Sequence, residues 1–189
     1  MKVYSIFSRL GFSNSYLIGP EAGGDAVVVD PGVFDAPLLQ AIESNGLYVR
    51  SILVTHAHNA HIKGIRGILR VYNASIYSNQ PSVLDNPARH IEDGEELTLG
   101  GIGFRVIETP GHSIDSVCFL AGQMLFTGDT LGAGTIGTTR DGYARGLLLE
   151  TVRRKLLSLG DEVLVFPGHG PPSKVGIEKL YNPWLGEKL

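Results

Sequence analysis

Five of the six histidines in this chain lie in three short segments, Thr55–His61, Thr109–Ser113 and Pro167–Gly170. Between the last two segments, Asp129 stands in the sequence Phe-Thr-Gly-Asp-Thr. Imidazole nitrogens with a carboxylate are the usual ligands of zinc, and of iron or manganese in related geometries. The sequence therefore predicts a metal site, and its candidate ligands are His56, His58, His61, His112, Asp129 and His169. His90 belongs to none of these segments and is interpreted as a surface residue.

The candidate ligands follow predicted strands, whose ends would hold them rigidly. Apolar patterns and turn residues predict strands at residues 3–7, 15–18, 26–30 and 51–54, and again at 96–99, 104–108, 116–120, 123–126 and 163–166. Helices are predicted at 36–44, 62–69 and 147–159. Because the strands form two batches that are each followed by a helix, we expect an α/β fold of one domain, residues 1–189. This fold is an αββα sandwich of two mixed sheets flanked by helices, with the metal at one edge.

The composition favours a globular protein and excludes several classes. Hydrophobic residues make up 43% of the chain, and no apolar run reaches the length of about 18 residues that suggests a membrane span. A net charge of −3 and the lack of a Lys/Arg block argue against nucleic acid as a partner. No export signal is recognisable, so we expect a cytoplasmic protein. The single cysteine, Cys118, is interpreted as a small buried hydrophobe.

Four segments together carry a resemblance to a known family. Thr-His-x-His-x-x-His, Thr-Pro-Gly-His-Ser, Phe-Thr-Gly-Asp-Thr-Leu and Phe-Pro-Gly-His-Gly-Pro occur in the order and spacing typical of the metallo-β-lactamase superfamily. The chain resembles more narrowly the single-domain glyoxalase II-like hydrolases, which also end in a segment similar to Ile177–Lys179 followed by Asn182–Leu185. The motifs are highly specific for the fold and less specific for the substrate.

The resemblance implies a role for each candidate ligand. It makes His56, His58 and His112 the ligands of a first metal, and His61 and His169 ligands of a second metal, with Asp129 bridging the two. The second-site aspartate of the family is replaced here by Ala60. We therefore expect one or two zinc ions, with iron or manganese as alternatives, and a weakened second site. Because three histidines with an open position suffice to activate water, the first site alone retains the potential for hydrolysis.

The segment Leu131–Gly146 follows Asp129 directly and is expected to overhang the metals and contact the substrate. Its candidate substrate residues are Arg140, Tyr143 and Arg145, although the two arginines also fit an ordinary solvated loop. Relatives often have Gly-Arg-Thr/Ser-Asp here, whereas this chain reads Ile-Gly-Thr-Thr-Arg-Asp-Gly. Inherited substrate specificity is therefore not expected. Asp30, at a strand end, is interpreted either as a carboxylate that orients a ligand or as a turn residue.

These observations favour a metal-dependent hydrolase of thioesters or other activated acyl compounds, with a small acyl molecule as substrate and Asp129 as the catalytic metal anchor. The first alternative is an iron-dependent persulfide dioxygenase, because relatives of that type use two histidines and one carboxylate, matching His56, His112 and Asp129. The second alternative is a non-catalytic metal-binding or regulatory protein, an interpretation that depends on Ala60 alone. The sequence does not indicate an oligomeric state.

Overall fold

Two mixed sheets form the centre of the computed structural model, which describes residues 1–9 and 11–186. Within these residues each sheet has six strands. The first sheet has the order β1-β2-β3-β4-β5-β8, with β1 Lys2–Ser8, β2 Ser13–Gly19, β3 Gly24–Val29, β4 Leu47–Leu53, β5 Ser75–Ser78 and β8 Arg89–His90. The second has the order β16-β15-β12-β11-β10-β9, with β16 Ser173–Lys174, β15 Leu164–Pro167, β12 Met124–Gly128, β11 Val117–Ala121, β10 Ile102–Glu108 and β9 Glu96–Leu99.

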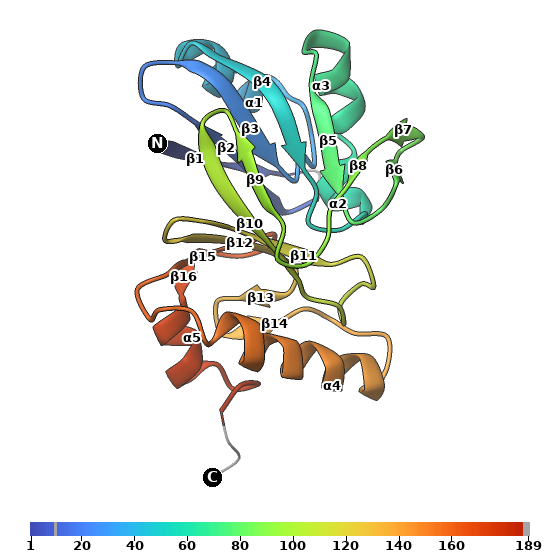
Figure 1. Cartoon of the computed structure of the whole chain (residues 1–189), viewed down its shortest axis with the longest axis vertical. Helices are drawn as coiled ribbons and strands as arrows, with labels where there is room; N and C mark the ends of the chain where they lie inside the picture. The colour runs from blue at the N-terminus through green and yellow to red at the C-terminus, as the bar shows by residue number, and fades with distance from the viewer. Residues whose placement is uncertain (10, 187–189) are drawn as a thin grey trace.

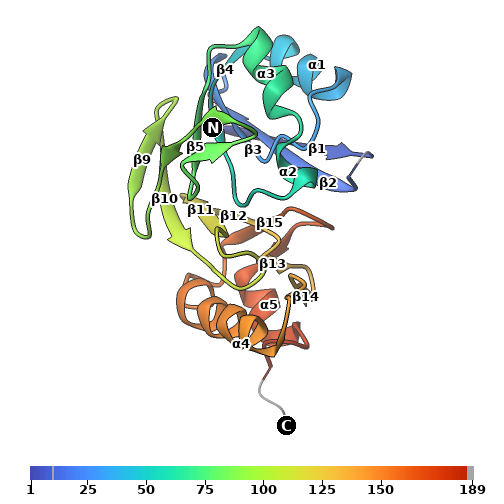
Figure 2. The ribbon, with the colours of Figure 1, turned by 90° about the vertical axis from the view of Figure 1, so that its right-hand side faces the viewer.

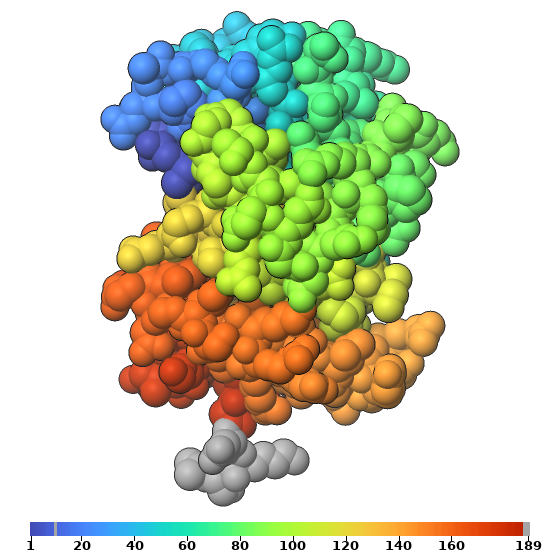
Figure 3. Space-filling model, in the orientation of Figure 1, coloured from blue at the N-terminus to red at the C-terminus, as the bar shows by residue number. Residues whose placement is uncertain are grey.

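Helices cover the outer faces of the two sheets (Figures 1 and 2). On the first sheet lie α1 Ala36–Ser44 and α3 Ile65–Val71, and on the second lie α4 Gly142–Thr151 and α5 Val175–Tyr181. The predicted αββα sandwich is therefore confirmed. The space-filling view shows the N-terminal half of the chain at one end of the molecule and the C-terminal half at the other (Figure 3). Among the described residues, no helix has both the length and the apolar character of a transmembrane span.

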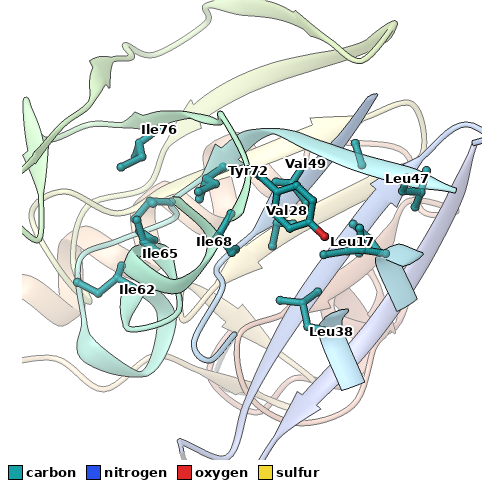
Figure 4. Close-up of a cluster of buried hydrophobic side chains, with 14 of the residues drawn as sticks. Leu17, Val28, Leu38, Leu47, Val49, Ile62, Ile65, Ile68, Tyr72 and Ile76 are labelled. Atoms are coloured by element: carbon teal, nitrogen blue, oxygen red, sulfur yellow. The ribbon is translucent and has the colours of Figure 1, made fainter. Parts of the chain in front are cut away.

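Successive side chains of a strand point to opposite faces of its sheet, and the apolar ones form three buried layers. In β3, Val27 and Val29 point between the two sheets, whereas Val28 points to the helix side of the first sheet. Leu38 of α1 and Ile68 of α3 pack against that outer face (Figure 4). The third layer lies between the second sheet and the helix that starts at Gly142, and it contains Cys118, which is fully buried as predicted. These layers hold the strands in place, so the strand ends that carry the candidate ligands lie at one edge of the sandwich.

Helix is present in the predicted segment 62–69, but it is divided into two short helices instead of one. These are α2 Asn59–Ile62 and α3, separated at Lys63 and Gly64. The Gly64 amide donates to the Pro31 carbonyl at 2.8 Å, and a Cβ on Gly64 would lie 2.5 Å from that oxygen. The close approach of these two backbones interrupts the helix. By contrast, α1 has the predicted bounds, and the Asp35 side chain accepts from the Leu38 amide at its start.

The predicted helix at 147–159 begins and ends too late. In the structure α4 starts at Gly142, because the Asp141 carboxylate caps it by accepting from the Ala144 amide at 2.8 Å. The helix continues as a π-helical turn, η1 Val152–Leu156. The preceding segment forms a small hairpin, β13 Leu131–Gly132 with β14 Thr135–Ile136. A second small hairpin, β6 Ser82–Val83 with β7 Asn86–Pro87, lies between β5 and β8.

Candidate metal centre

Three histidines and Asp129 converge at the edge between the two sheets. His56 and His58 lie after β4, His112 follows β10, and Asp129 follows β12. His58 Nδ1 lies 3.0 Å from both His56 Nε2 and His112 Nε2, and Asp129 Oδ2 lies 3.8 Å and 3.5 Å from the same two nitrogens. Ligands at 2.0–2.1 Å from a tetrahedral zinc ion are separated by about 3.3 Å. These four side chains, the first donor group, therefore have spacings that fit one metal ion.

A second donor group shares Asp129 with the first and adds His61 of α2 and His169 after β15. Asp129 Oδ1 lies 3.4 Å from His61 Nε2, and Asp129 Oδ2 lies 3.6 Å from His169 Nε2. Within the described chain, both ring nitrogens of His61 and Asp129 Oδ1 are buried without a hydrogen-bond partner. Buried polar atoms are costly unless they are paired or coordinate a metal. His61 Nε2 and Asp129 Oδ1, which lie 3.4 Å apart, fit a second cation, whereas His61 Nδ1 faces Asp30.

The electrostatics of the cluster suit metal coordination. Burial and the neighbouring histidines lower the pKa of His56 to about 2, so its imidazole is in the neutral, ligating form. Burial opposes ionisation of Asp129, but the surrounding histidines outweigh it and hold the pKa of this carboxyl well below its usual range. Burial likewise opposes the charged form of His61, yet Asp129 and Asp30 on either side raise its pKa to about 10. Negative charge is therefore concentrated around His61.

Asp30 orients the loop that carries the first histidines. Its carboxylate accepts from the Thr55 amide at 2.8 Å and from the Thr55 hydroxyl at 2.6 Å, and it lies 3.3 Å from His61 Nδ1. Since the Thr55 hydroxyl donates to Asp30, His56 Nδ1 donates to Thr55 Oγ1 at 3.1 Å, which leaves His56 Nε2 free to ligate. The structure thus supports the ligand-orienting interpretation of Asp30.

Backbone carbonyls orient the two remaining ligand loops. His112 Nδ1 donates to the Thr138 carbonyl at 2.7 Å, and His169 Nδ1 donates to the Phe12 carbonyl at 2.8 Å. Both rings therefore present Nε2 to Asp129. Asp115 joins two of the loops, because it accepts from the Ala57 amide at 2.9 Å and from the Ser113 hydroxyl. Sequence patterns did not predict these contacts, since a carbonyl oxygen has no side-chain signature.

The candidate substrate residues are only partly brought to the centre. A pocket of about 320 Å³ borders Asp129 and His169 and is walled by the β13–β14 hairpin. Arg140 and Tyr143 line a separate hollow beside His112, where Tyr143 is 83% exposed. Arg145 is exposed on the first turn of α4 and lines neither hollow. The expected loop 131–146 is thus a hairpin, a short connection and a helix start. His90 is exposed and belongs to neither donor group.

The fold and the donor groups define a class of protein. The chain belongs to the metallo-β-lactamase superfamily, whose family model matches residues 8–169. Members of this superfamily are in general metal-dependent and hydrolytic. Hydroxyacylglutathione hydrolase GloC of Haemophilus influenzae is 30% identical over 87% of this chain and 89% of its own length. An uncharacterised protein of Mycobacterium leprae is 34% identical over 91% of this chain and 93% of its own. The recognised resemblance is therefore confirmed.

Solved structures agree with this assignment. BLEG-1 B3 metallo-β-lactamase superposes with a TM-score of 0.88 at 29% identity, covering 98% of this chain and all of the other. ETHE1 from Myxococcus xanthus has a TM-score of 0.86 at 31% identity, covering 97% of this chain and 84% of ETHE1. A di-iron-bound form of TTHA1623 has a TM-score of 0.82 at 30% identity, covering 97% of this chain and 100% of the other. The fold is accordingly shared by a protein named as a β-lactamase and by one solved with two iron ions bound.

Proposed function

We propose that this protein is a metal-dependent hydrolase of thioesters or other activated acyl compounds. The observation that carries the proposal is the first donor group, in which three imidazoles and Asp129 converge beside a pocket of about 320 Å³. The similarity of this chain to hydroxyacylglutathione hydrolase GloC, over most of the length of both chains, supports an acyl compound as the substrate. Zinc is the proposed metal, with iron or manganese as alternatives, and a small acyl molecule is the proposed partner.

His56, His58 and His112 would hold the catalytic metal, while Asp129 anchors it and reaches toward the second donor group. A bound divalent metal supplies Lewis-acid activation of the acyl carbonyl and of water. Asp30 and the Thr138 carbonyl keep the ligand rings in place, so the donor geometry does not have to reorganise during the reaction. The hairpin β13–β14 forms a wall along which the acyl group would lie.

The substrate range is proposed to be broad. The connection after β14 carries Arg140 on an almost fully exposed side chain that pairs with Asp141 at 3.3 Å. An arginine in this position is not expected to bind one particular anionic group selectively, because exposed ion pairs contribute little binding energy. Small generic thioesters should therefore be hydrolysed at rates comparable to those of glutathione thioesters.

The experiment compares glutathione and non-glutathione thioesters in zinc-loaded protein, with thiol release as the readout. Turnover of both kinds supports the proposal. A strong preference for glutathione thioesters that is abolished by Arg140→Ala or Arg145→Ala would contradict the proposed breadth. No release from any thioester or ester by metal-loaded protein would contradict the hydrolase assignment and favour a non-catalytic metal-binding protein.

A second candidate is an iron-dependent dioxygenase acting on persulfides. The observation that favours it is the subset His56, His112 and Asp129, a two-histidine and one-carboxylate set of the kind that binds non-haem iron. The TM-score of 0.86 with ETHE1 shows that the backbone is compatible with the fold of that relative. Oxygen consumption by iron-loaded protein in the presence of a persulfide separates the candidates. Oxygen uptake without thioester hydrolysis would favour the dioxygenase.

A further inference from the structure

Two hollows border the donor groups. The pocket along the hairpin β13–β14 has Asp129 and His169 in its walls. The second hollow, of about 310 Å³, has His112 itself in its wall, and we call it the His112 hollow. Its lining consists of residues 111–114, Arg140, Tyr143, Ala144 and Leu147. His112 Nδ1 donates to the carbonyl of Thr138, which lines the hairpin pocket, so one hydrogen bond joins the walls of the two hollows.

Large apolar side chains in the His112 hollow are exposed to solvent. Ile114 is 82% exposed and Tyr143 is 83% exposed, and Leu147 adds apolar surface from α4. The guanidinium of Arg140 already pairs with the Asp141 carboxylate at 3.3 Å. A ligand that covers exposed apolar side chains removes them from water, which is favourable in proportion to the area covered. The lining therefore favours an apolar ligand over a charged one.

The loop side of the His112 hollow is held in place by Asp115. Its carboxylate accepts from the Ser113 hydroxyl and from the Ala57 amide, which lies at 2.9 Å. Because Ile114 lies between Ser113 and Asp115 in the sequence, this contact also fixes the position of the exposed isoleucine. The same carboxylate connects the loop to the segment that carries His58, so Ile114 has a fixed position relative to the first donor group.

The helix side of the hollow is equally well fixed. The Asp141 carboxylate accepts from the Ala144 amide, which sets the first turn of α4 and with it Tyr143. A Cβ on Gly111 would lie 2.5 Å from the Leu148 Cβ, so the histidine loop and α4 are in direct contact. Both walls are thus formed before a ligand binds, and little of the binding energy is needed to order them.

A thioester extends in two directions from its carbonyl carbon, toward the acyl group and toward the sulfur. With the carbonyl at the metal and the acyl group along the hairpin β13–β14, the sulfur arm needs a second site beside the first donor group. The His112 hollow is such a site, because a donor of that group forms part of its wall. Its volume lies at the lower end of the range for small-molecule sites.

We propose that the His112 hollow binds the thiol part of the substrate, and that Ile114 and Tyr143 make this chain favour thioesters of apolar thiols. The inference rests on the proposed hydrolase function and names the substrate class for it. In the reaction the acyl carbon gains the hydroxyl of water, the electron pair of the C–S bond leaves with the sulfur, and the sulfur takes up the remaining proton. The apolar thiol is then released from the hollow.

Kinetics with two matched substrate series test this assignment in zinc-loaded protein. One series keeps the acetyl group and lengthens the thiol from methyl to propyl and hexyl, and the other keeps methanethiol and lengthens the acyl group in the same steps. In the thiol series kcat/KM should rise about two- to fourfold per methylene, because each methylene removes further apolar surface from water. A steeper dependence on the acyl chain than on the thiol chain overturns the inference.

Two variants locate the effect. Ile114→Ala and Tyr143→Ala should flatten the dependence on thiol length, through KM more than through kcat, and alanine suits the first turn of α4 at position 143. The controls Ile177→Ala and Tyr181→Ala change exposed residues of the same types on α5 and should keep the full dependence. A full dependence in both hollow variants overturns the inference.

Methyl NMR gives a readout that does not depend on turnover. Ile114 lines the His112 hollow and Ile136 lines the hairpin pocket, so each hollow has its own isoleucine reporter. Zinc-loaded protein labelled at the isoleucine Cδ1 methyl groups is titrated with hexylthioacetone, a ketone that resists hydrolysis because a methylene separates its carbonyl from its sulfur. The Ile114 signal, assigned by its loss in Ile114→Val, should shift, and methylthioacetone should shift it far less.

The results separate this inference from the proposed function. Thiol release that does not depend on thiol length, with an unmoved Ile114 signal, overturns the inference and leaves the hydrolase assignment in place. A shift of the Ile136 signal alone puts the apolar arm in the hairpin pocket and also overturns the inference. No thiol release from either series overturns the proposed function, and the Ile114 signal then still decides whether the hollow binds an apolar arm.

Discussion

Asp30 illustrates how single residues set the metal centre. Its buried carboxylate contacts the Thr55 amide and hydroxyl and faces His61, so it touches the histidine loop at three points. Asp30→Asn keeps the shape but removes the charge, and zinc affinity should fall about 10–100-fold, as for other residues that orient metal ligands. A titration against a chromophoric chelator measures this. The control Asp25→Asn, whose carboxylate is exposed beside Arg50, should leave the affinity unchanged.

Gly128 shows a steric constraint next to Asp129. Its φ is +49°, and a Cβ there would lie 2.2 Å from the buried Thr55 hydroxyl. Gly101 also has a positive φ, +75°, but has open space around a Cβ. Gly101→Ala should lower the free energy of unfolding by about 1–2 kcal/mol through backbone strain alone. Gly128→Ala should cost about 1–3 kcal/mol more through overpacking. Urea unfolding measures both, and equal losses would contradict the steric argument.

The ligand types were predictable from the sequence because the candidate side chains gather in short segments that follow predicted strands. All six of them lie in the two donor groups. The carbonyls of Phe12 and Thr138 were not predictable, because any residue supplies a carbonyl and only the fold decides where it points. The close approach of Gly11 and Gly32 to Ala60 was not predictable either, because both glycines lie far from Ala60 in the sequence. Such tertiary contacts have no local pattern.

At the scale of elements, α5 fixes the hairpin β13–β14 that walls the substrate pocket. The buried carboxylate of Glu178 accepts from the Gly134 amide at 2.9 Å, from the Asn182 amide group at 2.7 Å and from the Ser173 hydroxyl. Asn182 in turn donates to the Thr135 carbonyl at 3.1 Å. The C-terminal helix thus holds the hairpin through one carboxylate and one amide.

Glu178→Gln should therefore affect both stability and substrate binding. It replaces the charged acceptor of the Gly134 and Asn182 N–H groups with a neutral amide oxygen and turns an N–H donor toward the Ser173 hydroxyl, so the free energy of unfolding should fall by about 1–3 kcal/mol. Because the metal donors are untouched, KM for a thioester should rise more than kcat falls. The control Glu150→Gln, exposed on α4, should change the free energy of unfolding by less than about 0.5 kcal/mol. A loss of kcat at unchanged KM would contradict this role of the hairpin.

Element boundaries were predicted less well than element types. The helix at 36–44 was predictable because Asp35 and a proline mark its start and Asn-Gly marks its end. The division between α2 and α3 was not, since it results from the contact of Gly64 with the Pro31 carbonyl. The start of α4 was placed too late because Asp141 was assigned to a substrate loop instead of a helix cap.

At the scale of the molecule, a bound metal would connect the two halves of the sandwich. His56, His58 and His61 come from the first half, whereas His112, Asp129 and His169 come from the second. A ligand that binds only the folded state stabilises it by about 2.7 kcal/mol at a concentration of 100 times Kd. Removing zinc with a chelator should therefore lower the thermal midpoint, and His112→Ala should lose most of this effect. An unchanged midpoint after proven metal removal would contradict the connection.

The central claim is that the first donor group makes this chain an acyl hydrolase. The most direct test titrates metal-stripped protein with zinc and records thiol release from a thioester. Most of the rate should appear with the first equivalent of zinc, because three histidines and Asp129 form the complete group. His112→Ala, which removes one of these donors, should show little rate at the same zinc concentration. A zinc-loaded chain that releases no thiol, or a rate that is equal with and without metal, would contradict the claim.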